Sequence, residues 1–190
     1  MGRAEHRIFF AVRLAGGAAD DAFALAGQVR TEHGLRGRLI PTDRLHVTLH
    51  WLQDHAVFPD ELVTQAGLAG RRVEIERFDV TFNRIESMGD ETHGGPLVLR
   101  GSDGLAALRR LQRALGAAMI DAGLGQYVRS SFKPHVTLLY DDGFVAPQAV
   151  DPIGWTVTEF VLVHSIIGKS KHLELGRWAL QSKQFGFDGW

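Results

Sequence analysis

The chain has 190 residues and a mass of 21.0 kDa, with 45% hydrophobic and 23% charged side chains, a composition that excludes disordered and fibrous proteins. Its 21 basic and 22 acidic residues give a formal charge of −1, so no overall positive field would hold it on long nucleic acid or an anionic membrane. The absence of cysteine excludes disulfides and thiol catalysis and fits a cytoplasmic location. The first apolar run, at residues 8–12, is too short for a signal sequence or a membrane span, so no membrane association is expected.

Apolar patterning predicts both strands and helices along the chain. Strands are expected at about residues 7–13, 45–52, 73–85, 96–100, 134–140, 156–166 and 172–180. Helical spacing of apolar residues predicts helices over 20–33 and 105–122, with a weaker signal over 60–69. Ser102 or Asp103 is expected to cap the helix at 105–122, and Gly123 to end it. Loops are expected at 53–59, 86–95, 141–152 and 168–171.

One strand sequence occurs twice. His46-Val47-Thr48-Leu49 recurs as His135-Val136-Thr137-Leu138, close to half a chain length later. Gly34-Leu35 and Gly123-Leu124 precede the two copies at the same spacing, and each glycine closes a predicted helix. The pattern predicts a duplicated α+β unit, with pseudo-repeats at about 6–52 and 78–140 and closing strands at about 155–180. We interpret residues 1–190 as one domain in which the two His-x-Thr strands face a shared cleft.

The repeated motif places an imidazole and a hydroxyl side by side. Residues two apart in a strand share a face, so His46 lies beside Thr48, and His135 beside Thr137. Without a metal, this set suits phosphodiester cleavage: one histidine takes a proton from water, the other gives one to the leaving oxygen, and the hydroxyls bind phosphate oxygens. Because the two halves are alike, the sequence leaves open which histidine is the base.

At these residues the chain resembles the 2H phosphoesterase superfamily, and within it the RNA 2′,3′-cyclic phosphodiesterases, also called 2′-5′ RNA ligases. Segments 7–12, 41–52, 132–139 and 160–180 carry the likeness, which covers nearly the full length. The resemblance implies an α+β fold of two lobes, with antiparallel sheets facing a central cleft and helices on the outside. It also implies that His46 and His135 are the acid–base pair, and that Thr48 and Thr137 are phosphate ligands.

Three further positions are candidate substrate contacts. Trp51 stands where family members often place an aromatic that stacks on a nucleobase, although strict strand alternation would turn it into the core. The same alternation would put His50 on the face of His46, where it could bind phosphate. Tyr140 stands where many bacterial members carry a phosphate-binding arginine. This difference leaves the exact identity of the substrate open.

The remaining cations and histidines give weaker signals. Five basic residues are candidates for contacting the rest of an RNA strand: Arg44, Arg129, Lys133, Lys169 and Lys171. Six histidines belong to no recognisable set and receive no role: His6, His33, His55, His93, His164 and His172. No HExxH motif, Walker motif or dinucleotide fingerprint is present, so neither a metal nor a cofactor is expected.

The expected activity is hydrolysis of a 2′,3′-cyclic phosphate end of RNA or of a nucleotide to a 2′-phosphomonoester, with reverse 2′-5′ ligation as a minor reaction. The protein is expected to be a monomer without an obligate protein partner. Two alternatives stay open. One is another 2H activity, on 2′-5′ oligoadenylate or an ADP-ribose cyclic phosphate, and the other is a non-catalytic module that binds RNA ends.

Overall fold

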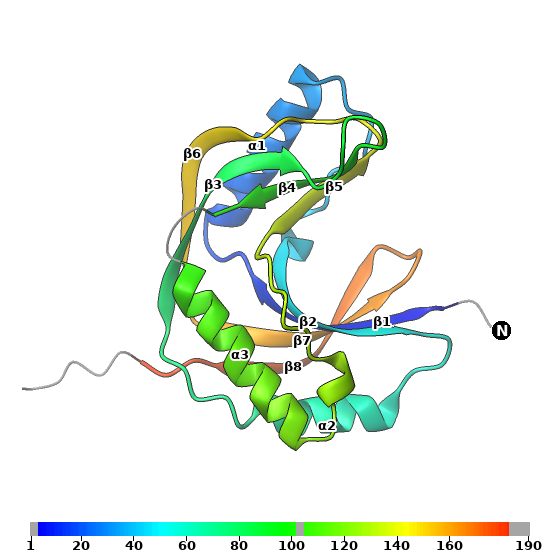
Figure 1. The fold of residues 1–190 in the computed structure, drawn as a ribbon, viewed down its shortest axis with the longest axis vertical. Helices are drawn as coiled ribbons and strands as arrows, with labels where there is room; N and C mark the ends of the chain where they lie inside the picture. Colours follow the sequence, from blue (N-terminus) through cyan, green and yellow to red (C-terminus); the bar gives the residue numbers. More distant parts are fainter. Residues whose placement is uncertain (1–3, 102–104, 183–190) are drawn as a thin grey trace, which may run out of the picture.

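The computed structural model describes residues 4–101 and 105–182. Within these residues the chain forms eight strands and three α-helices (Figure 1). The strands are β1 (His6–Arg13), β2 (His46–His55), β3 (Phe78–Ser87), β4 (Gly95–Arg100), β5 (Val136–Asp141), β6 (Gln148–Val157), β7 (Glu159–Ile166) and β8 (Lys171–Ala179). The helices are α1 (Ala18–Glu32), α2 (Asp60–Gly70) and α3 (Leu105–Asp121), and short 3₁₀ turns form at η1 (Thr42–Arg44) and η2 (Gly125–Tyr127).

The three predicted helices are confirmed, as is the role of Gly123, whose φ of 81° ends the helical segment. The two proposed caps, Ser102 and Asp103, lie outside the described residues. The strand predicted over 73–85 begins only at Phe78, and the run at 156–166 is two strands that separate at Thr158.

The prediction of a loop over 141–152 is wrong in its second half, where β6 begins. This strand is at one edge of the sheet, and its first five residues are all partly or fully exposed. It therefore lacks the apolar alternation that reveals a strand. It also contains Pro152, which is tolerated at a sheet edge because the unpaired side needs no donor.

All eight strands pair antiparallel in the order β6-β3-β4-β5-β2-β1-β7-β8. The order reads as two four-stranded halves, β5-β4-β3-β6 and β2-β1-β7-β8, that meet between β2 and β5. The pairing at this junction is Val47 with Val136, the second residue of each repeated motif. The two motifs are therefore neighbours at the centre of the sheet, related by a pseudo-twofold axis, and the predicted duplication and α+β fold are confirmed.

The helices cover the outer faces of the two halves. In Figure 1, α1 lies over the half that contains β5 and β6, while α2 and α3 lie together under the other half. The two long helices connect the halves: α1, which follows β1, contacts β5 and β6 of the other half, and α3, which follows β4, contacts β2 of the other half as well as β3 of its own. This exchange ties the two copies into one continuous apolar core. Within the described residues, no helix is long and apolar enough to cross a membrane.

Candidate active site

Both central strands carry a bulge at the last residue of the repeated motif. The register of β2 against β1 shifts by one residue at Leu49, and that of β5 against β4 shifts at Leu138. A bulge adds one residue to a strand and so exchanges the faces of all residues beyond it. The strict alternation assumed for the sequence therefore holds up to the threonine of each motif and is inverted directly after it; in β2 a second register shift follows between Trp51 and Asp54.

The bulge on β2 corrects the expected orientation of His50. Its side chain does not share the face of His46 but points into the core, where it is 3% exposed and its Nε2 donates a hydrogen bond to the Gln112 carbonyl oxygen at 2.8 Å. The next residue, Trp51, is 45% exposed on the cleft side. Its counterpart beyond the second bulge is Tyr140, which is 64% exposed.

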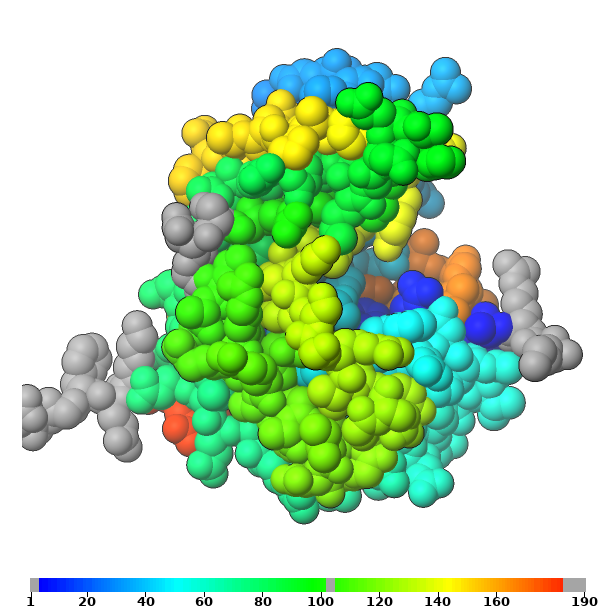
Figure 2. Space-filling model, viewed as in Figure 1, coloured from blue at the N-terminus to red at the C-terminus, as the bar shows by residue number. Residues whose placement is uncertain are grey.

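A cavity of about 580 Å³ brings the predicted residues together. His46, Thr48, Trp51, His135, Thr137 and Tyr140 all line it. A small apolar cluster on the same sheet face, formed by Phe9, Ala11, Val161 and Val163, lies beside it. Figure 2 shows the surface hollowed on this side, between the β4–β5 part of the molecule and β1 with the β7–β8 hairpin.

The two histidines are held in the same way. His46 Nδ1 donates to the carbonyl oxygen of Arg44 at 2.6 Å, and His135 Nδ1 donates to that of Lys133 at 2.8 Å. Each ring is thus anchored by the carbonyl two residues before it, which fixes the proton on Nδ1 and leaves Nε2 to exchange a proton with a ligand.

Their surroundings differ. The ring of His46 stacks on Phe9 at 4.8 Å between centroids and meets the edge of His172 at 5.6 Å. Burial lowers the pKa of His46 to about 4, opposed by its hydrogen bond to the Arg44 carbonyl and aided by the charges of Arg44, Arg13 and His135. His46 is therefore neutral near pH 7.

His172 on β8 is a cavity residue that the sequence did not indicate. It contacts the rings of His46 and Phe9, and its Nε2 lies 3.4 Å from Arg44 Nη2. Burial first, and then the charges of His46, Arg44 and Arg13, lowers its pKa to about 3. His172 belongs to no repeat, and only the fold of the β7–β8 hairpin brings it to the site.

An ion pair supports Trp51 at the rim of the cavity. Arg7 Nε and Nη2 each donate to Asp54 at 2.7 Å, and Trp51 Nε1 donates to the same carboxylate at 3.2 Å. The indole is thereby held on the exposed face of β2. Tyr140 has no comparable support among the contacts of the described residues.

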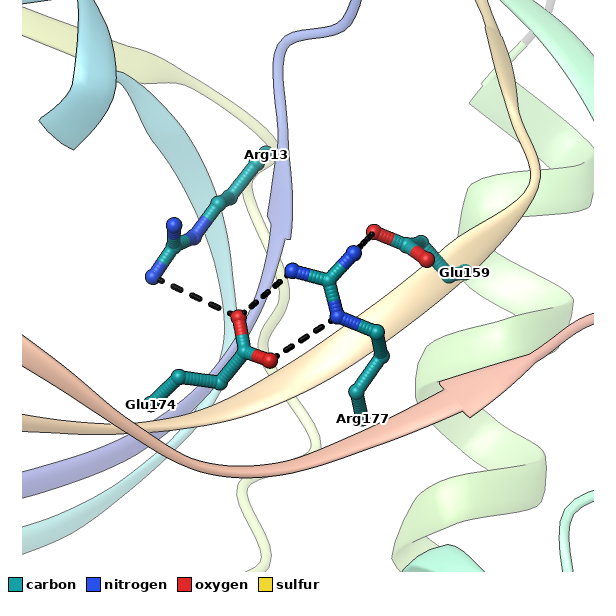
Figure 3. A network of polar contacts seen from close by, with 4 residues as sticks. All are labelled: Arg13, Glu159, Glu174 and Arg177. Atoms are coloured by element: carbon teal, nitrogen blue, oxygen red, sulfur yellow. Dashed lines mark hydrogen bonds and ion pairs between the residues drawn. The ribbon is translucent and has the colours of Figure 1, made fainter.

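Figure 3 shows a polar network formed by Arg13, Glu159, Glu174 and Arg177. Arg177 binds Glu174 through Nε and Nη2, both at 2.8 Å, and binds Glu159 through Nη1 at 2.5 Å. Glu174 also lies 3.8 Å from Arg13, which pairs with His46 in the β1–β2 register. The network holds the Arg13 cation near His46, where its charge adds to burial in lowering the pKa of that histidine.

The other predicted cations are distributed differently. Only Arg44 among them lines the cavity that contains both histidines. Arg129 and Lys133 line a neighbouring pocket that shares Thr48, Trp51 and His135 with this cavity. Lys169 and Lys171 are exposed at the turn between β7 and β8. In the part of the chain that the structure describes, no three His, Asp or Glu side chains are grouped so that they could hold a metal ion.

Comparison with known proteins identifies the family. A sequence model of the 2′-5′ RNA ligase superfamily matches residues 19–166, which include both His-x-Thr motifs. The chain belongs to this superfamily. The resemblance to 2H phosphoesterases is thereby confirmed. Among curated proteins, none matches the chain significantly in sequence.

Solved structures with the same fold cover almost the whole chain of this superfamily member. E. coli LigT in its apo form superposes with a TM-score of 0.72 at 24% identity, over 95% of this chain and 100% of LigT. The protein TT0787 of Thermus thermophilus gives 0.75 at 22% identity, over 93% and 99%. A protein described as a phosphoesterase gives 0.67 at 25% identity, also over 93% and 99%. LigT has also been solved in complexes with 3′-AMP, ATP, phosphate and NADP+.

Proposed function

We propose that this 2H superfamily member is a phosphodiesterase that opens 2′,3′-cyclic phosphates at the end of RNA or of a nucleotide, giving 2′-phosphomonoesters without a metal or a cofactor. The observation that carries the proposal is the pairing of Val47 with Val136, which puts two equally anchored imidazoles in one cavity. Two proton-transfer groups in one cavity are the requirement for in-line displacement at phosphorus.

In the proposed step, water attacks phosphorus while His46 Nε2 takes the proton from the water. The bond from phosphorus to O3′ breaks, and protonated His135 gives its Nε2 proton to O3′. The lowered pKa of His46 supports its assignment as the base, because a base has to be neutral before the reaction begins. The two histidines exchange their protonation states in each turnover and are reset by solvent.

The threonines and aromatics complete the proposed site. The hydroxyls of Thr48 and Thr137 face the same cavity and can donate to the non-bridging oxygens, where negative charge grows in the transition state. Trp51 and Tyr140 offer aromatic faces on which a nucleobase can stack.

A 2′-5′-linked dinucleotide is the second candidate substrate. It is favoured by the symmetric placement of Trp51 and Tyr140, one on each central strand, because such a substrate has a base on each side of the phosphorus. The same arrangement would serve reverse ligation of a cyclic phosphate end to a 5′-hydroxyl. Comparing the rates on 2′,3′-cyclic AMP and on 2′-5′-linked ApA separates the two candidates.

The proposal is tested by incubating the protein with 2′,3′-cyclic AMP in excess EDTA and identifying the product by ³¹P NMR. The expected product is 2′-AMP, at the same rate with and without EDTA. A variant that lacks both histidines, His46→Ala with His135→Ala, should be inactive, while His33→Ala, at an exposed position outside the cavity, should keep the full rate. Absence of turnover, or turnover that EDTA abolishes, would contradict the proposal.

A further inference from the structure

The cavity contains two arginines, and they differ in their acidic partners. Arg7 is bound by Asp54 through two hydrogen bonds. Arg44, in the turn η1 before β2, forms no ion pair within the described residues. No Asp or Glu in that part of the chain lines the cavity. The cavity therefore holds one positive charge that the described part of the protein does not neutralise.

The guanidinium of Arg44 also has an unused donor. Its Nε is buried and has no hydrogen-bond partner among the described residues. A buried donor without a partner destabilises a folded protein, so such groups usually bind something. A guanidinium presents several N–H donors in one plane, which match two oxygens of a phosphate.

His172 holds the other side of this guanidinium. Arg44 Nη2 points toward His172 Nε2 at 3.4 Å, which requires that Nε2 carries no proton. Burial lowers the pKa of His172 and so favours this acceptor form. The ring itself is fixed by edge contacts with Phe9 and His46. His172 thus limits the freedom of the Arg44 side chain without using its Nε donor.

We propose that Arg44 is a phosphate-binding residue of this cavity, held in place by His172. Its free donor and uncompensated charge take a non-bridging oxygen of the substrate phosphate, beside the two threonine hydroxyls. The inference rests on the proposed function for the identity of the substrate, but the anion site itself is defined by the contacts of Arg44. His172 acts through Arg44 and is a positioning residue.

The test measures binding of inorganic phosphate by isothermal titration calorimetry, which needs no turnover. Arg44→Gln should raise the Kd for phosphate at least about tenfold, because it removes a charged hydrogen bond. Arg44→Lys keeps the charge and should retain part of the affinity. Arg38→Gln removes an exposed cation from the loop before η1 and should leave the Kd unchanged.

His172→Phe keeps a ring of similar shape but removes the acceptor for Arg44, and should raise the Kd about threefold, with little further effect in the Arg44→Gln background. An Arg44→Gln protein that binds phosphate as tightly as the wild type overturns the inference, as does an equal effect of His172→Phe in both backgrounds. Turnover of 2′,3′-cyclic AMP is measured in parallel. If phosphate binding depends on Arg44 but the wild type has no turnover, the proposed function fails and the anion site stands.

Discussion

The two halves of the sheet carry one motif in two different surroundings. In both, a histidine donates Nδ1 to the carbonyl two residues earlier. His46, however, is enclosed by Phe9 and His172, which come from strands β1 and β8 outside the motif, whereas no ring contact is found for His135 among the described residues. The repeat therefore supplies the geometry of the site, and residues outside the repeat give its two histidines different surroundings.

The basic residues that precede the two histidines also differ in their surroundings. Arg44 and Lys133 occupy equivalent positions, and their carbonyls serve equivalent hydrogen bonds. The Arg44 side chain lines the cavity that contains both histidines, while that of Lys133 is exposed and lines the neighbouring pocket. The Arg44 cation, which has no acidic partner among the described residues, can give a substrate a preferred orientation in a site that is otherwise nearly symmetric.

The largest effect is expected at the histidines. His46→Ala and His135→Ala should each lower kcat by about 10²–10⁴-fold, since each removes one proton-transfer group. Similar losses would show that the two halves contribute equally despite their different surroundings. Steady-state rates on 2′,3′-cyclic AMP measure this, with circular dichroism to verify the fold. A single variant that keeps the wild-type rate would remove that histidine from the mechanism.

Substitutions of Arg44 and Lys133 should differ more in their effects than the two histidine substitutions. Arg44→Gln should lower kcat/KM by about 10²-fold, because it removes a hydrogen-bond donor to the reacting phosphate. Lys133→Gln should lower it by no more than about threefold, because the exposed Lys133 side chain does not line the cavity that contains Arg44. Equal losses in the two variants would refute the asymmetry.

The aromatic pair should show a smaller difference. Trp51→Ala is expected to raise KM about tenfold and Tyr140→Ala about threefold, because the indole is held by Asp54 and the tyrosine is not. The KM for 2′,3′-cyclic AMP measures both. A larger effect at Tyr140 would mean that the base stacks on the second strand instead.

The smallest effect is on stability. His46 and His172 have lowered pKa values, so the unfolded chain binds protons that the folded protein excludes. The two neutral histidines contribute fully to stability above about pH 6.5. This contribution is lost as the pH falls toward 4, so Tm should fall by several degrees over this range. His172→Phe should flatten the decline. A Tm that is constant between pH 6.5 and 4.5 would contradict the assigned burial of both rings.

The sequence predicted the features that depend on pattern. The repeated motif and the glycines that end α1 and α3 were enough to predict the duplication and the four residues at its centre. The bulge at Leu49 could not be predicted, because an inserted residue changes the faces of the residues beyond it without changing the composition. The bulge reversed the expected orientations of His50 and Trp51. His172 could not be found, since its role arises from the β7–β8 hairpin alone.

The dependence of kcat/KM on pH tests the central claim most directly, because it reports the base and the acid of the free enzyme. If His46 is the base, activity on 2′,3′-cyclic AMP should persist as the pH falls from 7 and decline only near pH 4, where His46 gains a proton. A loss of activity between pH 7 and 5 would contradict this role of His46.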